Sequence, residues 1–397
     1  MIVKQTIFEI VFWFSAGIIL YVYVIYPLVL SLVARRRDTT PLLSITPRVS
    51  LLISAYNESG IIEHKLRNAL SLDYPRDLLD IVVISDCSDD GTDELVAKYA
   101  PHGVRLLRQP QRLGKSSGLN LGVAQAFGEI LVFSDANAIY EHHAIPCLVR
   151  HFADPQVGYV VGNARYTEGA GQPASAKSES LYWKLETWLK EKESQFGSVV
   201  GGDGAIYAIR RELFTPLEPT DISDFLNPLQ IIVRGYRGVY EPHAISYEEP
   251  ADTFEKEFAR KIRIVSRSLN ALRRAPAVLL PWKQPRHWLA LVSHKVLRWL
   301  APVFLALIFL ASLLLWPIFI YRLTAFLQAV SYVLAASGWA IRRHRKVPNV
   351  LLLPYYFCLV NLASLLGLVK FVRGSLSPTW QTIRQQTSGP EESIGRP

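Results

Sequence analysis

The sequence predicts an α/β domain with a Rossmann-like, mostly parallel sheet, flanked by α-helical transmembrane segments at both ends of the chain. Between Val49 and Gly162, short apolar runs of β-strand type alternate with helical patterns. Strands and helices in repeated alternation build a parallel sheet that is covered on both faces. Near the amino terminus and again after Trp288, the composition becomes almost wholly apolar, which is typical of membrane-spanning helices.

Five apolar runs predict the strands: VSLLISA, DIVVIS, VRLL, EILVFSDA and VGYVVG. Helical patterns near residues 64–72, 94–99 and 116–127 lie between them. Ligands of such sheets bind in the crevice beyond the carboxyl ends of the strands. The polar residues that directly follow the strands are therefore the candidate site: Tyr56, Asn57 and Glu58; Asp86; residues 109–115; and residues 135–137.

Residues 1–36 are predicted to be a transmembrane signal anchor that stays uncleaved. The stretch 7–34 is longer than a signal-peptide core, and a small-residue cleavage site is absent before the arginine triplet 35–37. A buried helix of a soluble protein is the alternative, although a soluble helix of this length usually keeps a polar stripe. Three arginines against a lone Lys4 place the following domain in the cytosol by the positive-inside rule.

The region 251–296 is predicted to hold amphipathic helices at the membrane surface. From Phe254 to Arg274, apolar residues recur at helical spacing while basic residues fill the other face. An ordinary helix that packs on the domain with a solvated face is the alternative. In the first case, membrane lipids are the partners of this segment.

Residues 297–373 are predicted to be transmembrane helices, followed by a tail at 374–397. Three apolar stretches fit three further spans, or two spans and a re-entrant segment. The basic run 342–346 should be cytosolic, so the preceding two stretches form a hairpin. Three complete crossings would place the mildly basic tail on the outside, which conflicts with the same rule.

Charge and cysteine content exclude several classes of protein. The chain has 43 Lys and Arg against 34 Asp and Glu, a formal net charge of +9. Many of the basic residues lie at the edges of apolar segments, which indicates membrane topology and not a nucleic-acid partner. The cysteines, Cys87, Cys147 and Cys358, fit neither a disulfide framework nor a zinc site.

Two residues at strand ends are placed to meet a nucleotide. Asp86 opens an acidic, glycine-containing turn, where an N-cap and turn role is the alternative to binding a ribose or base. Lys115 lies between a strand and a helix, where it can meet a diphosphate; a solvated surface lysine is the alternative. A Walker-type phosphate loop is excluded, because Gln109 followed by Pro110 stands where that loop needs glycine.

Further oxygen ligands follow the fourth predicted strand and a later loop. Asp135 and Asn137 can face one divalent ion, or they can cap a turn. Asp224 could deprotonate an acceptor hydroxyl if it enters the same crevice, whereas a helix cap is the alternative, with Asp221 as the competing carboxylate. His142 and His143 adjoin the candidate metal site but are interpreted as surface residues.

Four motifs in this order and spacing resemble the family 2 glycosyltransferases with a GT-A fold: VSLLISAYNESG, VVISDCSDDGTDE, RLGKSSGLNLG and LVFSDANA. The flanking apolar segments resemble the membrane-embedded branch, which includes cellulose, hyaluronan and poly-N-acetylglucosamine synthases. The resemblance covers about residues 45–275, and it implies a GT-A domain over residues 45–250.

The resemblance also implies roles for single residues. Asp224 would be the general base, and Lys115 would bind the diphosphate of a nucleotide sugar, of the UDP-sugar type. Asp135 matches the first Asp of the Asp-x-Asp motif, where it also contacts the nucleotide, and Asn137 replaces the second; together they would hold Mg²⁺ or Mn²⁺. The nucleoside would be bound by Ala55, Tyr56, Glu58 and Asp86. The acceptor-side wall would include Gly202, Asp203, Gly204, Tyr182, Trp183 and Glu186.

One departure bears on the product. Polymerising members carry Gln-x-x-Arg-Trp on an interfacial helix, and the matching acceptor-side residues here are Arg260, Arg263 and Ile264. Losing an aromatic stacking platform weakens the grip on a sugar chain, which argues against processive polymerisation but not against transfer.

The expected function is inverting transfer of a sugar from a nucleotide sugar to a glycan or lipid-linked acceptor, in cell-surface or extracellular polysaccharide synthesis. The expected location is the inner (plasma) membrane, with several crossings and a cytosolic catalytic domain. Single-sugar transfer to polyprenyl phosphate and a non-catalytic nucleotide-sugar sensor are the alternatives. A transporter is disfavoured, because the apolar stretches 300–320 and 323–341 contain no carboxylates.

Overall fold

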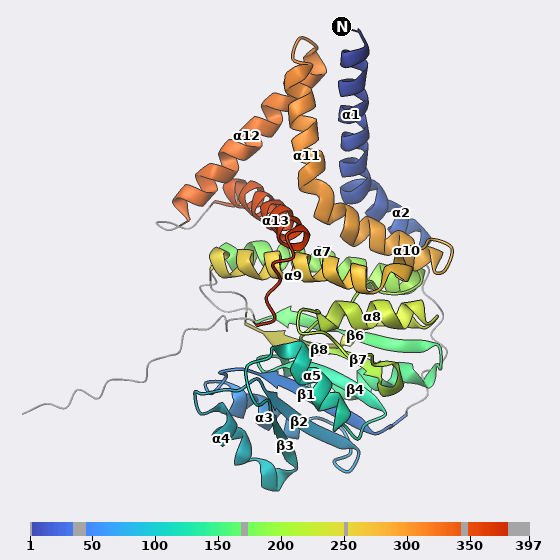
Figure 1. Cartoon of the computed structure of the whole chain (residues 1–397), viewed down its shortest axis with the longest axis vertical. Coiled ribbons are helices and arrows are strands. Elements are labelled where there is room, and N and C mark those ends of the chain that lie inside the picture. The colour runs from blue at the N-terminus through green and yellow to red at the C-terminus, as the bar shows by residue number, and fades with distance from the viewer. Residues whose placement is uncertain (1, 35–44, 168–173, 250–252, 343–347, 380–397) are drawn as a thin grey trace, which may run out of the picture.

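The computed structural model describes residues 2–34, 45–167, 174–249, 253–342 and 348–379. Figure 1 shows an α/β domain below and a group of long helices that rise from it. The helix α9 (Phe254–Arg274) runs between the two parts. The functional site lies along the boundary between the α/β domain and the long helices.

Within the described residues, eight strands form one sheet in the order β3-β2-β1-β4-β7-β6-β8-β5. Pairing is parallel between β3, β2, β1 and β4 and between β6 and β8, whereas β7 and β5 pair antiparallel to their neighbours. The predicted fold class, a mostly parallel Rossmann-like sheet, is therefore confirmed. The strands are β1 (Val49–Ala55), β2 (Leu79–Ser85), β3 (Val104–Arg108), β4 (Ile130–Asp135), β5 (Ile139–Tyr140), β6 (Val157–Tyr166), β7 (Tyr207–Arg210) and β8 (Arg237–Glu248).

One feature of the sheet differs from the simple alternation of strand and helix. The short strand β7 inserts antiparallel between β4 and β6, although it follows both in the chain. Its four residues carry too short an apolar run to stand out in the sequence. This insertion brings the loop 200–206, just before β7, to the carboxyl end of β4.

The register of the parallel strands aligns the candidate residues at one edge. Ala55 of β1 pairs with Ser85 of β2, and Ser54 pairs with Asp135 of β4. Every residue of β1 is buried, as expected for a central strand with helices on both faces. Asp86, which follows β2, and Asp135, which ends β4, therefore lie at the same edge of the sheet on either side of β1.

Helices cover both faces of the sheet, and alternate strand residues define two cores. Leu51 and Ile53 pack with α3 (Ile62–Leu70), α4 (Thr92–Ala97) and α6 (Ala144–Val149). Leu52 packs on the opposite face, with α5 (Lys115–Ala124), α8 (Ser223–Val233) and part of α9. The helix α7 (Ala174–Phe196) packs against β8 on the side of the domain that faces the long helices.

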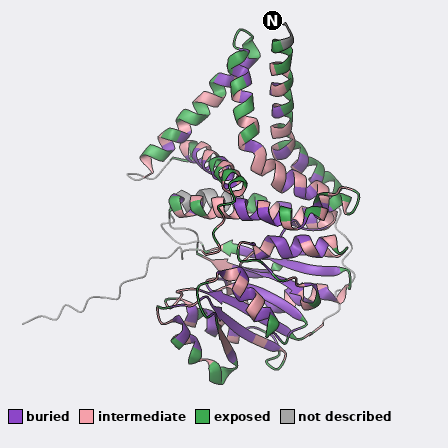
Figure 2. Cartoon of the chain, in the orientation of Figure 1, coloured by how far each residue is buried: buried purple, intermediate pink, exposed green. Residues whose placement is uncertain are grey.

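The described residues include four helices that are long and apolar enough to cross a membrane, as their length and composition show. They are α1–α2 (Ile2–Leu20 and Tyr26–Val33, joined by a π-turn), α10–α11 (Pro285–Leu291 and Leu297–Leu314, likewise joined), α12 (Phe319–Ile341) and α13 (Asn349–Val372). Figure 2 shows that exposed residues run along these helices, whereas the strands are buried. Large apolar side chains such as Trp13, Phe14 and Phe326 are more than half exposed, which suits contact with lipid.

Candidate active site

A cavity of about 680 Å³ lies at the carboxyl edge of the sheet, between the α/β domain and the long helices. Its walls come from the end of β4, the first turns of α5 and α8, the loop 200–205 and α9. Residues of α11 and α13 close it on the other side. A crevice beyond parallel strand ends is the usual binding site of such sheets.

Three charged side chains converge in this cavity around Gly204. A Cβ atom built on Gly204 would lie 3.2 Å from Asp224 Oδ2, 3.4 Å from Asp135 Oδ2 and 3.6 Å from Lys115 Nζ. Lys115 also forms an ion pair with Asp135 Oδ1. The missing side chain of Gly204 thus leaves room where a positive and two negative groups meet.

Each of the three residues owes its place to a local structural reason. Asp135 ends the buried strand β4, and Lys115 begins α5 after Gly114, which has a φ of +90° that glycine adopts readily. Asp224 lies in the first turn of α8, where the helix dipole favours negative charge. Asp221, the competing cap candidate, instead accepts a hydrogen bond from the backbone amide of Glu218 at 2.7 Å.

Asp224 has the environment of a group that accepts a proton. Its Oδ1 atom is buried without a hydrogen-bond partner. Burial raises the pKa of Asp224, the charge of Lys115 opposes this shift, and Asp203 and Asp135 raise the pKa further. A carboxylate with an unused oxygen and a raised pKa is suited to general-base chemistry near neutral pH.

The donor set near Asp135 fits a divalent cation that is held by few protein oxygens. Asp135 and Asn137 both line the cavity, as does the half-buried Glu248. Burial, followed by the charges of Asp135 and Asp203, raises the pKa of Glu248 to about 8. Groups of three or more His, Cys, Asp or Glu ligands are absent from the described residues, so the remaining ligands of a Mg²⁺ or Mn²⁺ ion would be phosphate and water.

Asp86 does not line the cavity. It is 2 % exposed, and its Oδ1 accepts hydrogen bonds from the backbone amides of Leu113 and Gly114, at 2.8 and 3.0 Å, and from Gln109 Nε2 at 2.7 Å. Burial raises its pKa against the opposing effect of these amides. In this structure Asp86 holds the turn that precedes Lys115, and nucleoside contact remains a prediction.

The other residues predicted to bind the nucleoside lie near the same edge. Glu58 lines the cavity, whereas Ala55 is buried at the end of β1. The guanidinium carbon of Arg112 lies 3.8 Å from the centroid of the Tyr56 ring, a cation–π contact. The guanidinium therefore covers one face of the Tyr56 ring.

The predicted acceptor-side residues form a further part of the cavity wall, in which Gly204 lies next to Asp135 and Asp224. Arg260 is held by Glu257 at 2.7 Å and also donates to the hydroxyl of Tyr166 at 3.2 Å. Asp203 accepts from Lys190 Nζ at 2.8 Å. The side chain of Tyr182 lies outside the described residues. The lining of the cavity includes Trp183, Glu186, Gly202, Asp203, Gly204, Arg260, Arg263 and Ile264.

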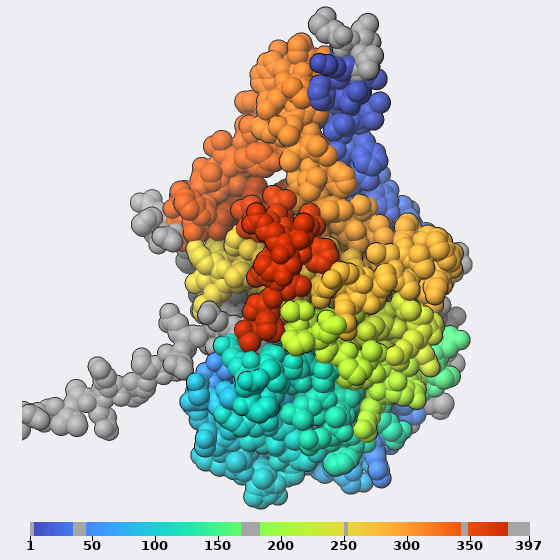
Figure 3. Space-filling model, in the orientation of Figure 1, coloured from blue at the N-terminus to red at the C-terminus, as the bar shows by residue number. Residues whose placement is uncertain are grey.

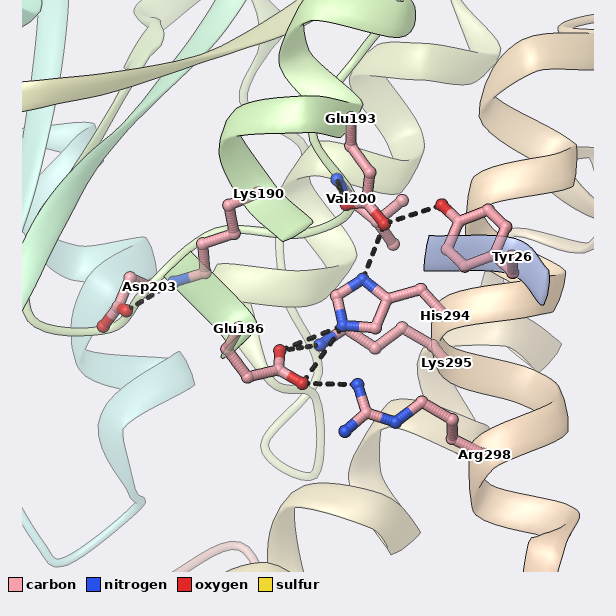
Figure 4. A network of polar contacts seen from close by, with 9 residues as sticks. All are labelled: Tyr26, Glu186, Lys190, Glu193, Val200, Asp203, His294, Lys295 and Arg298. Atoms are coloured by element: carbon pink, nitrogen blue, oxygen red, sulfur yellow. Dashed lines mark hydrogen bonds and ion pairs between the residues drawn. The ribbon is translucent and has the colours of Figure 1, made fainter. Parts of the chain in front are cut away.

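A buried polar network next to this wall was not predicted from the sequence (Figure 4). His294 Nδ1 lies 2.7 Å from Glu193 Oε1, and its Nε2 lies 3.0 Å from Glu186 Oε2. The hydroxyl of Tyr26 donates to Glu193 at 3.0 Å. Two carboxylates of α7 are thus bound by side chains of two membrane-type helices.

Two further cations complete this network on Glu186. Lys295 Nζ and Arg298 Nη1 donate to its carboxylate at 2.9 and 2.6 Å. Burial alone would raise the pKa of Glu186, but the charges of Lys295, His294 and Arg298 hold it well below its ordinary value. The sequence offered two signals for this network: carboxylates seven residues apart on one helix, and cations at the start of an apolar stretch. Neither signal indicates which residue will pair with which.

Lys65 is a second residue that sequence reasoning missed. It is fully buried, and its Nζ donates to Ser134 Oγ at 2.8 Å and to the carbonyl of Ala138. These two contacts bracket the turn that carries Asp135 and Asn137. Burial lowers the pKa of Lys65 to about 7, against the opposing charges of Asp135 and Glu248. Lys65 is therefore a positioning residue for the turn.

The fold of the chain agrees with a solved glycosyltransferase structure. The mannosyltransferase PcManGT from Pyrobaculum calidifontis, in complex with GDP-Man and Mn²⁺, matches with a TM-score of 0.67 at 23 % sequence identity. The match covers 93 % of this chain and 98 % of the mannosyltransferase. The α/β domain thus has the GT-A fold of nucleotide-sugar glycosyltransferases.

Residues 50–216 match the family described as Glycosyl transferase family 2. The chain therefore carries a glycosyltransferase family 2 domain, as its motifs predicted. The probable glycosyltransferase YdaM of Bacillus subtilis (strain 168) is 29 % identical over 232 residues, which are 55 % of this chain and 54 % of YdaM. A poly-beta-1,6-N-acetyl-D-glucosamine synthase of Staphylococcus aureus (strain MSSA476) is 27 % identical over 222 residues, 54 % of this chain and 53 % of the synthase. The chain spans about half the length of these curated relatives.

The buried Lys65 predicts a measurable pH dependence of stability. Its pKa is about 7 in the folded chain and about 10.4 when unfolded, so the unfolded state binds more protons between these values and stability rises with pH across that window. The unfolding free energy of the wild type minus that of Lys65→Met should increase by up to about 1.4 kcal/mol per pH unit above pH 7.

Denaturation of the detergent-solubilised chain between pH 6 and 10 checks this difference. The exposed Lys98 supplies the matched control, Lys98→Met, whose difference from the wild type should stay flat over the same range. A flat difference for Lys65→Met as well would contradict a neutral, buried amine.

Proposed function

We propose that the chain is a membrane-bound, inverting glycosyltransferase that moves a sugar from a nucleotide sugar, of the UDP-sugar type, to a glycan or lipid-linked acceptor. The observation that carries the proposal is the convergence of Lys115, Asp135 and Asp224 around Gly204. The family 2 domain and the GT-A fold support the reaction class. The membrane is proposed to be the plasma membrane, with the α/β domain in the cytosol.

In the proposed reaction, Asp224 removes the proton of the acceptor hydroxyl. The acceptor oxygen then forms a bond to the anomeric carbon from the face opposite the nucleotide, while the bond from that carbon to the diphosphate oxygen breaks. A single displacement of this kind inverts the configuration at the anomeric carbon. The proton stays on Asp224 until solvent removes it, and the nucleoside diphosphate departs.

Lys115 is proposed to stabilise the departing diphosphate. Its amine is charged, because the pull of Asp135 outweighs the effect of burial, which alone would lower its pKa. It stands at the start of α5, where the helix dipole also favours an anion. Asp135 and Asn137 would hold Mg²⁺ or Mn²⁺, which when bound supplies electrostatic stabilisation of the diphosphate.

Different observations favour two different acceptors. The Staphylococcus aureus relative is a polysaccharide synthase by its name, which favours a glycan. The cavity, however, is lined by Phe357 and Val360 of α13 and by Tyr23 of the amino-terminal helix. An apolar wall formed by membrane-type helices favours the second candidate, single-sugar transfer to polyprenyl phosphate, as does Ile264 in place of the aromatic residue of polymerising members.

Replacement of the proposed base tests the reaction. Asp224→Asn should lower the release of UDP from a UDP-sugar by about 10²- to 10⁴-fold, because an amide cannot accept the acceptor proton. The measurement is UDP release by purified protein with Mg²⁺ or Mn²⁺ over a panel of UDP-sugars, with UDP binding measured alongside. Binding should persist.

The exposed Glu218, which pairs with Arg274 outside the cavity, provides the matched control, Glu218→Gln. That variant should keep the turnover of the wild type. If Asp224→Asn lost UDP binding together with turnover, Asp224 would be a binding residue and the proposed base would have to be sought elsewhere.

A second replacement tests the proposed metal ligands. Asn137→Asp adds a carboxylate next to Asp135, and ligand charge strengthens the binding of hard cations. The concentration of Mn²⁺ that gives half-maximal turnover should therefore fall by about tenfold, equivalent to about 1.4 kcal/mol. Asn137→Ala should shift it in the opposite direction. An unchanged metal requirement in both variants would remove Asn137 from the metal site.

A further inference from the structure

The helix α13 is one of the four described helices that could cross a membrane by length and composition. Its contacts with α9 point to a different placement. Near its beginning, the Tyr355 ring packs edge-on against Phe254, with ring centroids 4.8 Å apart. Near its end, Gly367 approaches Val265 so closely that a Cβ atom on Gly367 would lie 2.8 Å from Val265 Cβ.

These two contacts show that α13 and α9 run alongside each other. Tyr355 and Gly367 are separated by roughly 18 Å of helix axis, and Phe254 and Val265 by roughly 17 Å, at 1.5 Å per residue. A helix that rose across a bilayer from α9 would leave it after one or two turns. Figure 1 shows α13 foreshortened just above α9, whereas α1 and α11 rise side by side away from the domain.

The chain beyond α13 returns to the α/β domain. Arg267 of α9 donates a hydrogen bond to the carbonyl of Ser377. The carbonyl of Pro378 lies against Gly114, where it leaves no space for a Cβ atom. Figure 3 shows the segment after α13 descending onto the surface of the domain. The carboxyl end of α13 is therefore on the domain side.

The amino end of α13 lies on the same side. Arg342, which follows the last turn of α12, forms an ion pair with Glu255 of α9 at 2.8 Å. Leu352, in the first turns of α13, packs in one cluster with Phe254. Both ends of α13 thus lie next to α9, which a membrane crossing does not allow.

We propose that α13 lies in the plane of the membrane, in the leaflet next to the α/β domain, and that the other three of the four described apolar helices cross the membrane: α1–α2, α10–α11 and α12. This placement removes the conflict in the charge pattern. Arg342, Lys370 and Arg373 all come to the same side as the domain, as the positive-inside rule requires.

The two faces of α13 suit this position. One face carries the exposed apolar side chains Leu362, Leu366 and Val369, and acyl chains of that leaflet would cover it. Phe357, Asn361 and Ser364 lie on another face and line the active-site cavity. In this position the helix separates the cavity from the lipid.

Cysteine labelling in sealed membrane vesicles tests the number of crossings. The background replaces Cys87, Cys147 and Cys358, and single cysteines are then introduced as Ser375→Cys after α13, Glu94→Cys on the domain and Trp316→Cys in the turn between α11 and α12; all three positions are exposed. A membrane-impermeant maleimide should label Ser375→Cys and Glu94→Cys in the same vesicle orientation. Trp316→Cys should react only in the opposite orientation.

A protease experiment on the unsubstituted chain keeps the test independent of these replacements. A carboxyl-terminal epitope should be digested in the vesicles whose α/β domain is digested. Labelling of Ser375→Cys together with Trp316→Cys, or protection of the epitope while the domain is cut, would establish a fourth crossing and overturn the proposal. Neither readout requires a sugar donor or turnover, so the result is separate from that of the proposed transferase reaction.

Discussion

The electrostatic balance at the end of β4 is the constraint on which the rest of the site depends. Asp135, Asp203, Asp224 and Glu248 all face one cavity that the membrane-side helices close. Lys115 offsets part of this negative charge by pairing with Asp135. Burial, and after it the charges of the neighbouring carboxylates, raise the pKa values of Asp224 and Glu248. Such a site is stabilised by added positive charge and by a ligand that brings its own cation.

Much of the fold could be predicted because the central strands are continuous apolar runs with polar residues directly after them. The positions of Lys115 and Asp135 follow from that pattern and from the rule that parallel strands end at one edge. Asp224 was a candidate from the sequence, but only the resemblance to a motif favoured it over Asp221, because its approach to Asp135 depends on the antiparallel insertion of β7 and on the resulting position of α8. The spacing of residues in the sequence predicts neither the insertion of β7 nor the position of α8.

Residues whose partners lie far away in the chain were beyond sequence reasoning. His294 meets Glu186 across 108 positions, and Lys65 meets Ser134 across 69. Asp86 shows a related limit. Its place after β2 was expected, but its carboxylate is occupied by backbone amides, and a sequence does not reveal which amides a turn will present. Side-chain type and position were accessible, whereas the choice of partner was not.

The buried network around His294 has a mechanical consequence. Hydrogen bonds and ion pairs are costly to break where water is excluded, so α7 and the helices that carry Tyr26 and Arg298 move as one body. A rotation of the α/β domain relative to these helices would have to break this buried network. The network therefore holds the crevice in one position relative to the long apolar helices that border it.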